Sequence, residues 1–268
     1  MPRLAPVPAL AAVLVALAPV APAAAQDFAA VVSPPRFEFQ AQPGERVRQV
    51  VEITNVSPQA SSFSLRTADW TLGPDGSVSF AEGLAAGSCR EWVAIERHQI
   101  EVPGGGRYRY RFEVQPPAGV PPGECRFALL IEGDPQTVQT PNGLPVPVSG
   151  RIGVIVYVAV GSAAADLQVV QSGVLDTPNG TQPVLTVRNT GNAHGRLDGF
   201  LSGADANGRR LEFAPSTLPI LPGETRVIPL SATDGRVAVN DVAYPVQIAG
   251  VIEWGDGRRI EIDQPFTR

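Results

Sequence analysis

Apolar and polar residues alternate along most of this chain in short runs that are separated by turn residues. The longest such run spans residues 144–160, where Leu144, Val146 and Val148 alternate with prolines and a continuous apolar stretch follows. Alternation with a period of two residues places these three side chains on one face of a strand. The run therefore predicts one long β-strand with a single arginine, Arg151, in its middle.

Two prolines, Pro145 and Pro147, lie in the first half of this predicted strand. Proline has no backbone N–H, and in sheets it occurs at edges and bulges. Successive N–H groups point to opposite sides of a strand, so these prolines remove donors from one side only. We expect the first half at a sheet edge and the apolar continuation in a core. An apolar edge invites pairing with another chain, and that pairing is our main functional hypothesis; an edge strand that only packs on its own sheet is the alternative.

The chain before this run predicts several more short strands, and no amphipathic helix is evident. Ser33-Pro34-Pro35 divides the first strand, which we expect to be interrupted and to change sheets. Within residues 46–56, Val51 and Ile53 share one face. Short strands between proline-glycine loops are typical of an all-β sandwich. Further strands are expected at 62–70, 92–95, 108–114 and 126–132.

The second half of the chain repeats the landmarks of the first in the same order. Residues 50–57, VVEITNVS, resemble residues 184–191, VLTVRNTG, and each is an alternating strand that ends at an asparagine. An Asp-Gly or Asn-Gly turn, a P-G-x-x-R pattern and a late apolar strand follow in both halves. Agreement of four landmarks indicates an internal repeat. The sequence thus predicts two tandem immunoglobulin-like β-sandwiches, with a boundary near residue 163.

The N-terminus has the features of a secretory signal peptide. Arg3 precedes a short apolar run at residues 10–17, and Ala23-Ala24-Ala25 supplies the small residues of a cleavage site. The apolar run is too short for a membrane anchor, and no later segment is long enough to cross a bilayer. We therefore expect a signal peptide at 1–25, an exported protein without membrane insertion, and domains at 26–162 and 163–268.

Charge and cysteine content narrow the classes of function. The formal net charge is −5 and every basic residue besides the two histidines is an arginine, which argues against nucleic acid as a partner. In an oxidising compartment the only two cysteines, Cys89 and Cys125, are candidates for a disulfide, with two buried thiols as the alternative. Two cysteines without a nearby histidine pair do not form a zinc site, so no metal is expected.

Four features together resemble the periplasmic pilus-assembly chaperones of the chaperone–usher pathway. They are the signal peptide, the early S-P-P-R-F, the E-I-T-N strand and the arginine-centred strand, and a second domain built around V-R-N extends the likeness. The resemblance implies two immunoglobulin-like domains in an L shape. It also implies a basic pair, Arg36 and Arg151, that holds the C-terminal carboxylate of a pilin subunit, and a strand that donates Leu144, Val146 and Val148 to that subunit.

The resemblance further implies a pilin-like partner, an outer-membrane usher as a possible second partner, a periplasmic location, no cofactor and no enzymatic activity. A carboxylate that loses water in a cleft needs charge-assisted, preferably bidentate partners, which arginine supplies. The family's proline-acidic-arginine-glutamate signature is not recognisable in PPGECRFALLIE, and the prolines and the cysteine pair are also unusual for the family. The chain therefore reads as a divergent relative whose client can differ from an ordinary pilin.

Other classes of function have weaker support in the sequence. His98 and His194 lack a nucleophile in a recognisable motif nearby, and His194, in a turn, is expected to be solvated. Trp70, Trp92 and Trp254 could form a sugar-binding platform, although single tryptophans on separate strands are more often core anchors. The alternatives to a chaperone are thus a carbohydrate-binding module and a structural or adhesive envelope protein.

Overall fold

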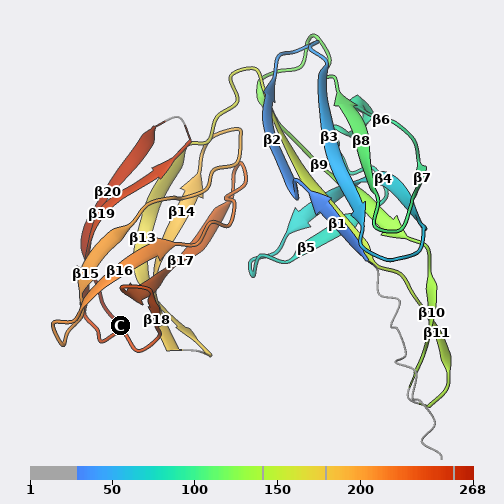
Figure 1. The fold of residues 1–268 in the computed structure, drawn as a ribbon. Helices are drawn as coiled ribbons and strands as arrows, with labels where there is room; N and C mark the ends of the chain where they lie inside the picture. The colour runs from blue at the N-terminus through green and yellow to red at the C-terminus, as the bar shows by residue number, and fades with distance from the viewer. Residues whose placement is uncertain (1–28, 141, 179, 256) are drawn as a thin grey trace, which may run out of the picture.

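The computed structural model describes residues 29–268 apart from 141, 179 and 256, and its regular elements are almost all β-strands (Figure 1). The predicted all-β class is confirmed. The signal peptide predicted for residues 1–25 lies outside the described residues. The first half contains β1 (Ala30–Ser33), β2 (Arg36–Ala41), β3 (Val47–Asn55), β4 (Ser61–Leu72), β5 (Val78–Ala81), the single-turn helix η1 (Arg90–Trp92), β6 (Val93–Ile95), β7 (Gln99–Val102), β8 (Arg107–Val114), β9 (Gly123–Gly133), β10 (Gln136–Gln139), β11 (Pro145–Val148) and β12 (Arg151–Val160). The second half contains β13 (Leu167–Thr177), β14 (Gly180–Asn189), β15 (Leu201–Ala204), β16 (Arg210–Pro215), β17 (Thr225–Asp234), β18 (Val237–Val239), β19 (Val246–Trp254) and β20 (Arg258–Phe266).

The first sandwich packs a sheet with strand order β1-β3-β8-β6 against a sheet with order β2-β12-β9-β4-β5, in which β7 also pairs with β4. Alternate residues of each strand enter one shared core. Val51 and Ile53 of β3 share one face, as predicted, and are fully buried, and so are Val154 and Val156 of β12. The apolar continuation of the arginine-centred run therefore lies in a core.

The first strand changes sheets at its prolines, as the sequence predicts. β1 pairs antiparallel with β3, whereas β2 pairs parallel with β12 in the opposite sheet. Pro34 and Pro35 donate no backbone hydrogen bond, so the ladder is interrupted between the two segments. The switch is important for the site, because it places the start of β2, at Arg36, beside the middle of β12.

The second sandwich has the strand order β13-β14-β17-β16-β15-β19-β20, and β18 pairs with β17. The first part of β17 pairs with β14 and its second part pairs with β16, so β17 takes part in both layers. Phe213, Leu230 and Ile248 are fully buried in a core separate from the first. Two tandem β-sandwiches are thus present, while the exact boundary near residue 163 and the L shape stay predictions.

Two buried asparagines brace the two sandwiches in the same way. The Nδ2 amide of Asn55 donates to the backbone oxygens of Gln59 (2.7 Å) and Val102 (3.0 Å). The Nδ2 amide of Asn189 donates to the oxygens of Ala193 and Ile220, both at 2.8 Å. In each case one acceptor lies four residues after the asparagine and the other lies just before the P-G turn, which matches the internal repeat read from the sequence.

The predicted disulfide between Cys89 and Cys125 is present, with the two Cα atoms 5.7 Å apart. It joins the start of η1 to β9 across 36 positions of the chain. Both cysteines lie in the first core. None of the helices in the described part of the chain is long and apolar enough to cross a bilayer.

Candidate partner-binding edge and cleft

The predicted long strand over residues 144–160 is in fact two strands, β11 and β12, separated by Ser149 and Gly150. The prediction of a single strand is therefore wrong. β12 stays in the sandwich beside β9, but β11 pairs only with β10, and these two strands form a separate two-stranded sheet. Figure 1 shows this hairpin projecting away from the body of the first sandwich. The alternating pattern could not reveal the break, because both strands keep the same period.

The predicted donor side chains are exposed on this hairpin. Leu144, Val146 and Val148 have 64%, 41% and 51% of their surface exposed. Exposed apolar side chains in one row are unusual for a strand that packs on its own sheet, and they are available to another polypeptide.

The backbone of β11 presents different groups on its two sides. The N–H of Thr140 donates to the Leu144 carbonyl (2.9 Å), so the Leu144 backbone faces β10. Because the direction alternates along a strand, Val146 and Val148 also face β10, while Pro145 and Pro147 face outward. The outer side of β11 therefore offers carbonyl oxygens but no N–H donor from these prolines.

One side of β12 is open over its first four residues. β9 pairs with β12 along its whole length, from Arg151 to Val160. β2 pairs with it only from Ile155 to Val160, and Arg36 is the residue opposite Ile155. No described strand lies beside residues 151–154 on the β2 side, so an unpaired edge leads from β11 directly to Arg36.

Arg36 lies at the end of this edge, in a cluster with a surplus of positive charge. Its guanidinium forms an ion pair with Glu38 at 2.6 Å and is about half exposed. Glu38 also contacts His194 (3.6 Å) and Arg196 (3.4 Å) from the second sandwich. The hydrogen bond from His194, aided by the surrounding charges and opposed by burial, lowers the pKa of Glu38 to about 2.

Arg151 belongs to a different and electrically balanced cluster. It contacts Glu132 at 3.2 Å and Glu82 at 3.8 Å. Arg66 contacts the same two carboxylates at 2.7 and 2.9 Å. The hydrogen bond from Arg66, with that from Arg151, holds the pKa of Glu132 below its usual value despite partial burial. Two arginines and two glutamates thus neutralise one another.

The structure places Arg36 and Arg151 on the same face of the sheet but does not bring them together. Arg36 is opposite Ile155, and four residues along a strand separate Cα positions by about 13 Å. The Phe80 ring lies against Gly153 between them, where any larger side chain on β12 would overlap it. The basic pair is therefore divided by an apolar contact from the β4–β5 hairpin.

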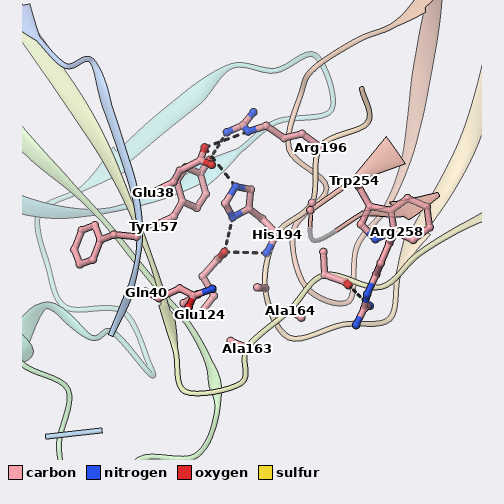
Figure 2. A pocket seen from close by; sticks show the side chains of 16 residues that line it. Glu38, Gln40, Glu124, Tyr157, Ala163, Ala164, His194, Arg196, Trp254 and Arg258 are labelled. Atoms are coloured by element: carbon pink, nitrogen blue, oxygen red, sulfur yellow. Dashed lines mark hydrogen bonds and ion pairs between the residues drawn. The ribbon is translucent and has the colours of Figure 1, made fainter. Parts of the chain in front are cut away.

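His194, which the sequence indicated as a solvated turn residue, is instead buried between the two sandwiches. Its side chain is 10% exposed, and its ring stacks on Tyr157 with the centroids 3.9 Å apart. The Glu124 carboxylate, 2% exposed, contacts His194 Nδ1 and also accepts a hydrogen bond from its backbone N–H at 2.8 Å. Figure 2 shows the ring held between Glu124 and Glu38. Burial opposes protonation, but hydrogen bonds to both carboxylates outweigh it and raise the pKa of His194.

The β4–β5 hairpin makes a second contact between the sandwiches. Arg226 of β17, almost fully buried, donates through Nη1 to the carbonyls of Gly73 (2.9 Å) and Pro74 (3.3 Å) in the hairpin turn. Beside the His194 contact lies a cavity of about 300 Å³ that Trp254 and Arg258 also line (Figure 2). Three or more potential metal ligands do not gather anywhere in the described part of the chain.

The tryptophans do not form a common exposed platform. Trp254 is buried in the second core, Trp92 packs against the first core, and Trp70 makes an edge contact with Tyr157 at 5.6 Å. The interpretation of Trp254 as a core anchor is confirmed, and the arrangement does not favour a carbohydrate-binding module.

No protein-family model matches the sequence, and no curated protein does. Similar solved structures include the YadV chaperone, at 12% identity and a TM-score of 0.48 over 89% of this chain and 100% of that chain. The Pseudomonas aeruginosa CupB2 chaperone is 13% identical, with a TM-score of 0.47 over 88% of this chain and 100% of that chain. The class 5 fimbriae chaperone CfaA is 11% identical, with a TM-score of 0.44 over 89% of this chain and 99% of that chain. At these identities and TM-scores the likeness by itself assigns no function to this chain.

Proposed function

We propose that this protein is a periplasmic chaperone that binds a pilin-like subunit by strand addition and performs no covalent chemistry. The observation that carries the proposal is the open edge of β12, which begins at the exposed hairpin and ends at Arg36. Strand addition obtains affinity from main-chain hydrogen bonds and specificity from alternate side chains. The edge offers the first, and the exposed row of Leu144, Val146 and Val148 offers the second.

The proposal also includes a direction for the bound strand. A partner strand on the open edge would lie in line with β2 and would end where β2 begins. If it runs parallel to β12, as β2 does, its C-terminal carboxylate meets Arg36. Seven residues separate Ile155 from Val148, or about 23 Å of extended chain. Leu144, the most distant donor residue, lies eleven residues before Ile155. A segment of roughly eight to twelve residues therefore reaches from Arg36 to the donor side chains.

Charge favours the Arg36 end over the Arg151 end as the anchor for a carboxylate. At the Arg151 end the charges cancel, and an incoming carboxylate would have to displace Glu132 or Glu82. At the Arg36 end cations outnumber carboxylates, so an added negative charge is attracted. The arginines there are Arg36, Arg126 and Arg196, and the carboxylates are Glu38 and Glu124. In this proposal Arg151 flanks the bound strand and is the second, weaker contact.

The test uses a synthetic thirteen-residue peptide with valine at alternate positions, threonine between them and a free C-terminal carboxylate. Loss of a hydrogen bond to a charged group costs about 1.5–3 kcal/mol, so Arg36→Ala should weaken binding roughly 10- to 100-fold. Arg151→Ala should have a smaller effect. Arg48→Ala is the matched control, because Arg48 is an exposed arginine of β3 that pairs with Glu113 away from this edge.

Amidation of the peptide should weaken binding to the parent protein as much as Arg36→Ala does, and should add nothing to that variant. Calorimetry or fluorescence anisotropy at low ionic strength measures all combinations. Equal affinity of the parent for the acid and the amide, or equal affinity of the parent and Arg36→Ala for the acid, would show that no carboxylate is held at Arg36.

A further inference from the structure

Strand β11 has a complete hydrogen-bonding edge on one side only, and that side is already occupied. The backbone groups of Leu144, Val146 and Val148 face β10, with Val146 opposite Val138 and Val148 opposite Gln136. On the outer side, the prolines give acceptors without donors. A strand added there finds partners for its N–H groups at Pro145 and Pro147 but none for the intervening carbonyls.

Strand β10, which occupies the complete edge of β11, is weakly held. β10 pairs with β11 over four residues, and within the described part of the chain neither strand has a third partner. A two-stranded hairpin without a third strand or a packed face is marginally stable in water. The hairpin also stands away from the sandwich, so no core holds β10 in place (Figure 1).

We propose that β10 is a displaceable cover of β11, and that a second strand of the bound partner takes its place. This inference rests on the proposed function, in which a first partner strand lies along the open edge of β12 and ends at Arg36. The second strand would complete a full ladder with Leu144, Val146 and Val148. β11 would then lie between two partner strands, and its three apolar side chains would lie on one face of the sheet that the three strands form.

In the free protein, the prolines and β10 together keep β11 from pairing with other copies of the chain. An apolar edge strand with both sides open would pair with other copies of the chain. Here prolines blunt the outer side and β10 covers the inner side, so no complete edge of β11 is offered until β10 leaves. The displacement of β10 must therefore cost little free energy, and a short hairpin fulfils that requirement.

The test compares two proline substitutions on β10. Val138 is opposite Val146, so its N–H points to β11, and Val138→Pro breaks the pairing without changing β11. Thr137 is opposite Pro147, so its N–H points away from β11, and Thr137→Pro is the matched control. The probe is the amidated valine–threonine peptide, which lacks the carboxylate for Arg36. We expect Val138→Pro to bind it at least fivefold more tightly than the parent, and Thr137→Pro to bind it as the parent does.

A third variant, Val146→Pro, removes a donor from the complete edge of β11 and should abolish the gain when combined with Val138→Pro. Thermal unfolding of each variant checks that the sandwiches are intact. If the amidated peptide binds Val138→Pro no better than Thr137→Pro, β10 is not a cover and the inference is wrong. That outcome leaves the proposed function standing, because the latter depends on the acid peptide and Arg36.

Discussion

The two sandwiches share a bracing device, yet their last strands, β12 and β20, are placed differently in their sheets. In both, an asparagine at the end of an alternating strand ties the following loop to a backbone carbonyl that lies just before a P-G turn. In the second sandwich the last strand, β20, is the outermost strand of its sheet and pairs with β19 along nine residues. In the first, β12 lies between β9 and β2 but lacks a neighbour on the β2 side over residues 151–154, next to an exposed hairpin. The repeated frame therefore sets the fold, and the departures from it mark the place where we propose that a partner binds.

The largest effects are expected from removing the shared device, one asparagine at a time. Asn55→Ala and Asn189→Ala each leave several buried carbonyl and N–H groups without a partner, at about 1–3 kcal/mol for each group. We expect a loss of about 4 kcal/mol in the free energy of unfolding of the affected sandwich, which is near the upper limit for one substitution. Urea unfolding followed by tryptophan fluorescence measures it.

The tryptophans separate the two sandwiches in this experiment. Trp70 and Trp92 report on the first sandwich and Trp254 reports on the second. In a Trp254→Phe background the tryptophan fluorescence therefore comes from the first sandwich alone. If the asparagines are equivalent, Asn55→Ala shifts the first transition as far as Asn189→Ala shifts the second. A loss below about 1 kcal/mol in either case, the size of an ordinary hydrogen bond, would contradict the equivalence.

A smaller effect, confined to the first sandwich, is expected from the disulfide. The double variant Cys89→Ala with Cys125→Ala opens a loop of 36 positions, which costs about 3–4 kcal/mol in the chain-entropy model. The second sandwich, followed by Trp254 fluorescence, should unfold at an unchanged urea concentration, because the disulfide lies wholly in the first core. An equal shift of both transitions would show that the sandwiches unfold as one unit.

Local features of the fold were readable from the sequence because their causes are local. Prolines before Arg36 predicted the change of sheet, and the pattern around Asn55 and Asn189 predicted the repeat. The break after Val148 was not readable, since two strands with the same period look like one. The role of His194 was missed because its carboxylate partner, Glu124, lies 70 residues away and nothing near either residue indicates the contact. The charge balance that separates Arg36 from Arg151 likewise depends on residues from several strands.

The smallest effect is expected where the two sandwiches meet, and it depends on pH. Folding raises the pKa of His194, so the stabilisation from its positive charge is complete below the unfolded value of about 6.5 and is lost as pH rises through the folded value. His194→Gln removes that charge but keeps a polar side chain. The parent should melt about 2–4 °C above this variant at pH 6, which corresponds to roughly 1 kcal/mol in a chain of this size, and the difference should shrink toward pH 9.

Proton NMR of the imidazole rings follows the titration directly, because the chain has only two histidines and His98→Gln assigns the remaining signal. The groups that face His194 are Glu124 of β9, Glu38 of β2 and Tyr157 of β12, with Arg196 beside them. Glu124→Gln removes the more deeply buried carboxylate and should return the pKa of His194 toward its ordinary value. A parent titration at or below 6.5, or a melting difference that does not change with pH, would mean that His194 joins the sandwiches as a neutral ring. The charged contacts at the junction would then be those of Arg196 with Glu38 and of Arg226 with the β4–β5 turn, and neither arginine titrates in this range.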